Sequence, residues 1–313
     1  VVDPRRYTDY ANLEYTRQKA IELYGREYGI NFPFEERPAG RPAKTSPLYG
    51  TLKAKRAMFC ARAGWERAAW FPPEGMDAVE KASHHRTNWF EAVGEECKAV
   101  RERVAILDLP GFAKFEITGA GAASYLDRLV AGRLPRIGRI GLCYVCTERG
   151  GVQSEFTVTR LTEDRFYLCC AGGAEWHDQQ LLSQHLPSDG SVRLENVTGL
   201  YGTLVIAGPS SRALLERVTD ADLSNAAFPW LSARPIEIGF MAVRALRVNY
   251  VGELGWELHL PMASMQPVYD RLMAAGADLG VADFGMYDLD SLRLEKCYRG
   301  WKVDLVVEYS PLE

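Results

Sequence analysis

The sequence predicts an α+β chain made of two lobes and a long N-terminal arm. Hydrophobic residues make up 47% of the 313 residues, which is enough for a packed core. From residue 89 onward, strand-like and helix-like segments succeed one another in two similar rounds, whereas the preceding residues lack such regularity. We therefore expect a connector arm over residues 1–88, a first α+β lobe over 89–200 and a second over 201–313.

The arm combines one helical segment with irregular chain. Residues 10–28 carry a helical pattern, and a proline-rich passage follows at 32–47. Aromatic side chains bury large areas, so an aromatic-rich stretch interrupted by prolines is typical of irregular chain packed on another surface. The aromatic residues of this stretch are Trp65, Trp70, Phe71, Trp89 and Phe90.

In the two lobes the apolar periodicity changes repeatedly between that of a helix and that of a strand. The first lobe is predicted to contain helices at 90–104 and 120–130, a strand at 115–119, strands on either side of Gly150-Gly151, and a strand at 165–170. The second is predicted to contain strands at 202–207, 236–238, 241–249 and 256–260, and helices at 210–218, 265–275 and 286–298.

Charge and cysteine content exclude several classes of protein. The 37 basic and 41 acidic residues nearly cancel, which predicts neither a nucleic-acid partner nor a membrane-surface partner. Seven cysteines, an odd count without regular spacing, indicate a reducing compartment rather than a disulfide scaffold. The longest apolar stretches are too short to span a membrane.

Several catalytic motifs are absent or incomplete. Cys143 and Cys146 form a lone CxxC without a second pair of ligands at zinc-site spacing, so no metal site is predicted. No GxSxG or HExxH sequence occurs, which argues against a serine hydrolase or a zinc protease. Gly119 and Gly121 are not followed by the third glycine of the dinucleotide fingerprint, so this chain should not bind FAD or NAD by itself.

One constellation carries recognisable chemistry. In Tyr250-Val-Gly-Glu-Leu-Gly-Trp-Glu257, two glycines bracket a turn, and we expect Tyr250 and Glu257 at the outer ends of two adjacent strands. A carboxylate beside aromatic rings suits a flat heterocycle with adjacent N–H donors, because it accepts two hydrogen bonds while a ring stacks. The alternative is a simple tight turn, which explains Gly252 and Gly255 but not the flanking residues.

This segment resembles the YxGExGxE segment of the glycine-cleavage aminomethyltransferase (T-protein) family. It is most similar to the version fused to flavin-dependent dimethylglycine and sarcosine dehydrogenases. Further pieces match in family order along the whole chain. They are residues 46–49, 64–67, 88–90, 112–115, 148–151, 156–160, 220–224 and 290–296.

The resemblance implies an aminomethyltransferase-like folate-binding fold that captures a one-carbon unit on tetrahydrofolate. A flavin domain, in cis or as a separate subunit, would oxidise an N-methyl amine such as dimethylglycine or sarcosine. We expect that FAD domain and the small C-terminal barrel of relatives to be missing from this chain, and the chain alone to be inactive. The family implies a bacterial cytoplasm or the mitochondrial matrix.

The resemblance also implies roles for individual residues. Tyr250 and Glu257 match positions that contact the pterin, and Arg293 matches an arginine beside the folate site. Glu155 stands where many members carry an essential aspartate, and it would position the folate amine that attacks the electrophilic carbon. The alternative for Glu155 is a surface acid at a hairpin end. Candidates for binding the acidic folate tail are Arg247, Arg293 and Arg299.

Three departures from the family pattern leave two other functions open. Leu142 and Thr147 replace a tyrosine and an asparagine, and Glu155 replaces the aspartate. Such changes fit a non-catalytic regulatory or adaptor protein, since the resemblance extends to a regulatory subunit of pyruvate dehydrogenase phosphatase. A folate-dependent O- or S-demethylase shares the fold but lacks the connector over residues 1–47, so the connector favours the amine dehydrogenases.

Overall fold

A six-stranded sheet forms one half of the protein, in the strand order β10-β11-β12-β9-β3-β13. The computed structural model describes residues 9–312. The short β13 pairs with β3 in parallel, and the other neighbours are antiparallel. The strands are β3 (Ala105–Asp108), β9 (Tyr201–Ala207), β10 (Ala233–Ile238), β11 (Met241–Leu246), β12 (Gly255–Pro261) and β13 (Ala282–Asp283).

Helices cover both faces of this sheet. Alternate residues of a strand point to opposite faces, so Leu204 and Ile206 of β9 pack with α6 (Ser211–Glu216) and α7 (Met265–Ala275). Val205, between them, packs with α3 (Phe90–Glu102) and α8 (Met286–Glu295) on the other face. Both faces are therefore buried, and the strand reads as a continuous apolar run.

A five-stranded antiparallel sheet forms the other half, in the order β5-β6-β7-β4-β8. Its helices α4 (Ala122–Leu129) and α5 (Glu175–Gln184) pack through Leu126 and Leu182 on a core that includes Phe115 of β4. The strands are β4 (Phe112–Thr118), β5 (Ile140–Cys146), β6 (Val152–Arg160), β7 (Arg165–Ala171) and β8 (Arg193–Asn196). Residues 9–312 form no closed barrel.

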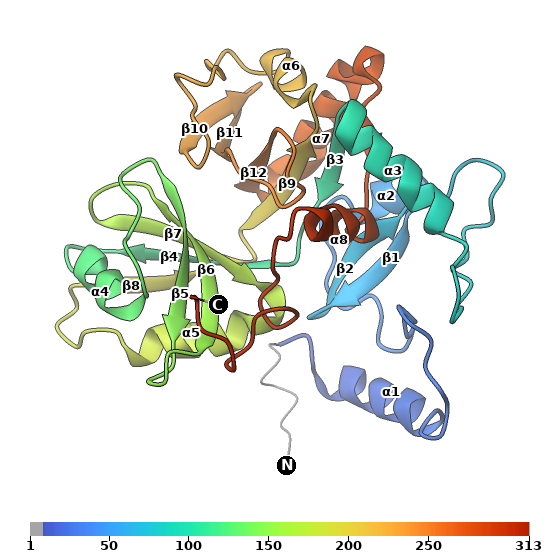
Figure 1. The fold of residues 1–313 in the computed structure, drawn as a ribbon, viewed down its shortest axis with the longest axis horizontal. Helices are drawn as coiled ribbons and strands as arrows, with labels where there is room; N and C mark the ends of the chain where they lie inside the picture. Colours follow the sequence, from blue (N-terminus) through green and yellow to red (C-terminus); the bar gives the residue numbers. More distant parts are fainter. Residues whose placement is uncertain (1–8, 313) are drawn as a thin grey trace.

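The two sheets meet through polar side chains and through small apolar clusters, one of which joins Ile140 of β5 to Ala233 and Leu246 of the six-stranded sheet. Figure 1 shows the two halves side by side. The hydroxyl of Tyr167 on β7 lies 3.0 Å from Nδ1 of His259 on β12. Arg244 of β11 donates to Glu116 of β4 at 2.9 Å. Because buried polar groups are costly unless paired, these contacts specify how the sheets align.

The arm contains more regular structure than its composition predicts. Beyond α1 (Leu13–Tyr24) and α2 (Tyr49–Ala54), a hairpin of β1 (Met58–Arg62) and β2 (Trp65–Trp70) occupies the stretch expected to be irregular. Trp70 is fully buried and packs with Val93 of α3. The strands therefore form by packing against the six-stranded half, although the prolines after residue 70 favoured irregular chain for this stretch.

Most predicted elements lie within a few residues of the observed ones, but some elements end earlier than predicted and one strand joins a different sheet. The strand predicted at 241–249 ends at Leu246, and the helix predicted at 286–298 ends at Glu295. The strand β3, which was not predicted, falls within the range expected for the first lobe, yet it pairs with β9 in the six-stranded sheet. The five-stranded sheet therefore begins only at β4, whereas the expected division at residue 201 falls between β8 of one sheet and β9 of the other.

Candidate functional site

Glu155 lies on β6, directly opposite Tyr144 of β5. Burial raises the pKa of the Glu155 carboxyl to about 7, and a hydrogen bond from Tyr144 opposes part of that shift. Burial, followed by the neighbouring Glu155 charge, raises the pKa of Tyr144 in turn. Glu155 is therefore a half-buried carboxyl that exchanges a proton near neutral pH, which the surface acid of the alternative interpretation would not do.

Tyr250 lies in the loop between β11 and β12 rather than at a strand end. Its hydroxyl donates to the backbone carbonyl of Arg299, and its ring stacks on Tyr298 with centroids 5.8 Å apart. Burial raises the pKa of Tyr250 to about 12, while Arg293 lowers it and Glu155 raises it further. The backbone carbonyl of Tyr298 also accepts from Arg293, so Tyr250 and Arg293 meet at residues 298–299, which follow α8.

Arg293, near the end of α8, is buried and engaged by protein groups. Its Nε donates to Asp290 and its Nη1 to Asp304, each at 2.6 Å, and Nη1 also donates to the Tyr298 carbonyl at 2.9 Å. These carboxylates offset the cost of burying the guanidinium. Arg293 thus holds residues 298–304 beside Tyr250 instead of presenting an unpaired charge.

The other two arginines proposed for the folate tail differ in availability. Arg247 is 9% exposed and donates to Asn225 at 2.7 Å and to the Phe228 carbonyl. Arg299 is exposed, and its side chain makes no ion pair within residues 9–312. Among the three candidates, only Arg299 presents a free guanidinium.

Glu257 lies on β12, opposite Leu246 of β11, and is 8% exposed. Its Oε2 is 3.1 Å from Nε2 of His259 on the same face of the strand. Since a carboxylate only accepts, Nε2 carries the proton and Nδ1 accepts from Tyr167. The expected placement of Tyr250 at a strand end is wrong, because β11 ends four residues before Tyr250, which lies in the following loop.

Lys114 interacts electrostatically with Glu257, and the sequence analysis did not identify it as a candidate. It lies fully buried on β4, where Nζ donates to the Phe112 carbonyl at 3.1 Å. Burial lowers the pKa of its ammonium group, and the charges of Cys169 and Glu257 oppose this shift. Its neighbour Phe115 packs on the helices behind the sheet, so β4 is buried on both faces. No local pattern distinguishes such a lysine from a solvated one.

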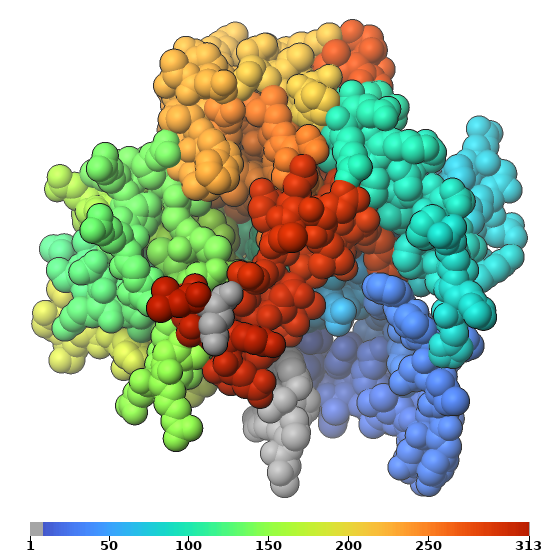
Figure 2. All heavy atoms as spheres, in the orientation of Figure 1, coloured from blue at the N-terminus to red at the C-terminus, as the bar shows by residue number. Residues whose placement is uncertain are grey.

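The C-terminal segment covers the turn beside Glu155. Gly150 has a φ of +85°, and a Cβ added at Gly151 would overlap the carbonyl of Val307. Val152 donates its N–H to Tyr309 at 2.9 Å. Figure 2 shows this red segment crossing the front of the molecule toward the green five-stranded half. The Gly-Gly pair is therefore required by a turn and by a close backbone approach.

The two other departures from the family pattern have simple local roles. Thr147 accepts a hydrogen bond from the Gly151 N–H at 3.1 Å and so closes the same turn. Leu142 is 57% exposed on the edge strand β5. Neither contributes a polar group to the cluster around Glu155.

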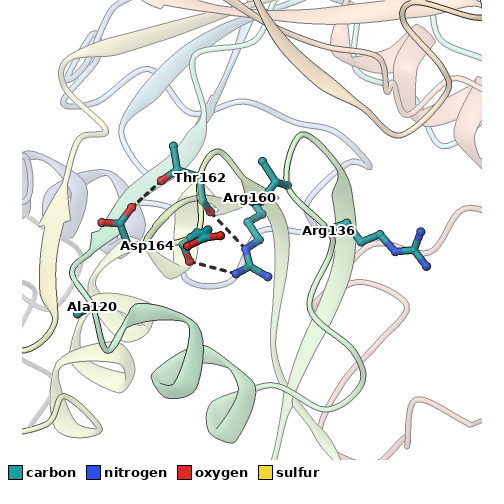
Figure 3. A pocket seen from close by; sticks show the side chains of 7 residues that line it. Ala120, Arg136, Arg160, Thr162 and Asp164 are labelled. Carbon is teal, nitrogen blue, oxygen red and sulfur yellow. Dashed lines mark hydrogen bonds between the residues drawn. The ribbon is translucent and has the colours of Figure 1, made fainter.

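A surface cavity of about 1000 Å³ lies away from all of these residues. Figure 3 shows Arg160 turned toward the Thr162–Asp164 turn, while Arg136 points away from it. Arg160 donates to the carbonyls of Thr162 and Glu163, and Thr162 donates to Asp164, so these groups satisfy one another. The cavity holds no acid–base pair, and we place the candidate site at Glu155, Tyr250 and Glu257.

Residues 9–312 contain neither a metal-binding cluster nor a membrane-spanning helix. No group of three or more His, Cys, Asp or Glu side chains is arranged to hold a metal ion within that range. No helix in the described part of the chain has the length and apolar character needed to cross a membrane.

Sequence comparison finds relatives that match the chain along its whole length. A family described as the GCVT N-terminal domain matches residues 48–313, and the FAD dependent oxidoreductase central domain matches residues 1–46. Mitochondrial dimethylglycine dehydrogenase of Mus musculus is 40% identical over 100% of this chain and 36% of that protein. Mitochondrial sarcosine dehydrogenase of Homo sapiens is 34% identical over 95% of this chain and 37% of that protein. The chain thus spans little more than a third of these relatives.

Structural comparison agrees with the sequence. Aminomethyltransferase T of the glycine cleavage system from Bartonella henselae superposes with a TM-score of 0.71 and 24% identity, covering 86% of this chain and 66% of that one. This likeness confirms the α+β, aminomethyltransferase-like fold predicted from the motifs. The chain belongs to the GCVT aminomethyltransferase-domain family and is homologous to the dimethylglycine and sarcosine dehydrogenases.

Proposed function

We propose that this chain carries out tetrahydrofolate-dependent one-carbon transfer as part of a flavin-dependent dehydrogenase that demethylates an N-methyl amine such as dimethylglycine or sarcosine. The observation that carries the proposal is the half-buried Glu155 carboxyl, which lies opposite Tyr144 and whose pKa burial raises to about 7, in a chain homologous to such dehydrogenases throughout. FAD would be bound by a flavin domain in the same polypeptide or in a separate subunit. The compartment would be a bacterial cytoplasm or the mitochondrial matrix.

Glu155 would be the group that handles a proton. With a pKa of about 7, its carboxyl exists in both protonation states near neutral pH. Bound tetrahydrofolate supplies the amine that takes up the one-carbon unit. The Glu155 carboxylate would accept a hydrogen bond from that amine, hold it in place and receive its proton as the new bond forms.

Glu257 and Tyr250 would hold the pterin ring. Glu257 would accept hydrogen bonds from adjacent N–H donors, and His259 restrains the orientation of its carboxylate. Arg293 would act indirectly, because Asp290 and Asp304 already engage its guanidinium. Arg299 is the better candidate for the folate tail, since its side chain is exposed.

Two other functions remain as outcomes of a test. The match of residues 1–46 to the FAD dependent oxidoreductase central domain favours an amine dehydrogenase over a folate-dependent O- or S-demethylase. A regulatory or adaptor protein on the same fold is favoured by Leu142 and Thr147, which offer the cluster no polar group.

Calorimetric titration of the full-length gene product with tetrahydrofolate tests the proposal. Glu257→Gln should weaken binding by about tenfold or more, because a charged acceptor is lost. Glu155→Gln should retain binding but lose one-carbon transfer. Glu148→Gln, an exposed acid on the same hairpin, is the matched control and should change neither. Absence of binding in a folded sample would refute the proposal and put the adaptor function first.

A further inference from the structure

The helix α1 is amphipathic with its apolar face outward. Leu13, Ala20, Ile21 and Tyr24 lie on one face of the helix, together with the exposed Arg17, whose aliphatic stem adds to that face. Leu13 is 86% exposed, Ile21 64% and Tyr24 81%. No residue of α1 is buried. A helix on the surface of an isolated domain would normally bury this face.

The polar face of α1 is instead the one bound to the rest of the arm. Gln18 accepts the Gly40 N–H at 2.9 Å, and Glu22 accepts the Ala39 N–H at 3.0 Å. Lys19 donates to the carbonyl of Arg37 at 3.0 Å. These three side chains fix the rotation of the helix about its axis. The outward direction of the apolar face is therefore determined by specific hydrogen bonds.

The chain after the helix continues the apolar surface. Figure 1 shows α1 at the margin of the molecule, outside both large sheets. Large exposed apolar surfaces on a folded protein mark a place where another surface binds. The exposed apolar residues that follow the helix are Tyr28, Ile30, Phe32 and Phe34, of which Phe32 and Phe34 also contact aromatic rings of the rest of the protein.

We propose that the outward face of α1 docks on the FAD-binding domain of the same polypeptide. The FAD dependent oxidoreductase central domain matches residues 1–46, the stretch that contains α1 and its polar anchors. The relatives that align over the whole chain are nearly three times as long, so most of their length lies outside this module. An apolar helix face of this kind binds in an apolar groove of its partner. This inference rests on the proposed function, because it requires a flavin domain.

Hydroxyl-radical footprinting of the full-length, FAD-loaded gene product tests the docking. Phe240, which is fully exposed at the tip of the β10–β11 turn, is the internal reference for an unprotected aromatic ring. Tyr24 and Tyr28 should be labelled at least about tenfold more slowly than Phe240, as expected for side chains in the dry centre of an interface. Equal labelling of the three rings would overturn the proposal.

Variants separate docking from an indirect effect. Leu13→Ser combined with Ile21→Ser should restore labelling of Tyr24 and Tyr28 to the Phe240 level, whereas Leu200→Ser, an exposed apolar site elsewhere, should not. Protection that disappears on dilution together with a halved mass would identify a second copy as the occupant and overturn the proposal. So would a full-length product without an FAD-binding domain.

Failure of the docking and failure of the proposed function can be told apart by a second measurement. Tetrahydrofolate binding is measured in the same preparation by calorimetry. Protected Tyr24 and Tyr28 without tetrahydrofolate binding would leave the docking intact and refute one-carbon transfer. Binding of tetrahydrofolate with unprotected tyrosines would refute the docking alone.

Discussion

Replacing Glu155 by Gln should stabilise the protein above pH 7 while removing the group proposed to handle the proton. Burial raises the pKa of this carboxyl from 4.5 to about 7. Between these pH values the folded state keeps a proton that the unfolded state has released, so the free energy of unfolding falls as the pH rises. The shift corresponds to about 3 kcal/mol at pH 8. Gln carries no charge and keeps an oxygen that can accept from Tyr144, so it avoids this cost.

Urea denaturation of the full-length gene product at several pH values measures the effect. Glu155→Gln should unfold with nearly the wild-type free energy below pH 5 and with about 3 kcal/mol more at pH 8. The control Glu148→Gln should show no such trend, because this acid is exposed. A difference that does not change with pH, or a variant less stable at pH 8, would refute a burial-driven shift.

The remaining predictions concern the contacts that join the sheets and the segment that covers the site. Burial lowers the pKa of His259 from 6.5, so the free energy of unfolding should fall as the pH drops below about 6.5, and His259→Gln should reduce this fall in thermal melts between pH 7 and 5. Arg244→Met should cost about 2 kcal/mol in urea, because the buried Glu116 loses one of its two arginines. The double variant Arg244→Met/Glu116→Gln should lose less unfolding free energy than the sum of the losses in the two single variants. Additive losses would contradict the pairing of Arg244 with Glu116. Gly151→Ala should make the chain beyond residue 300 more sensitive to limited proteolysis, since the added methyl group overlaps the Val307 carbonyl, and unchanged digestion would argue against that contact.

Local patterns were sufficient to predict most elements of the two lobes. The helix predicted at 265–275 coincides with α7, and the strand predicted at 202–207 differs from β9 by one residue. Both have a periodicity that depends only on neighbouring residues. The positive φ of Gly252, at +75°, also agrees with the predicted turn. The arm was harder to predict, because the β1–β2 hairpin forms only by packing on α3 and α8.

The motifs determined the family and named Glu155, Tyr250, Glu257 and Arg293, but not how these residues meet. The loop after β11 places Tyr250 against the Tyr298 ring and the Arg299 carbonyl, which follow α8 in the chain. The engagement of Arg293 by two carboxylates and the burial of Lys114 likewise depend on side chains from distant elements. Sequence periodicity records which face of a segment is apolar, whereas burial, charge pairing and pKa depend on what lies opposite that face. For this protein, the sequence determined the local elements and the family, and the tertiary structure decided which groups are buried, which are paired and which are exposed.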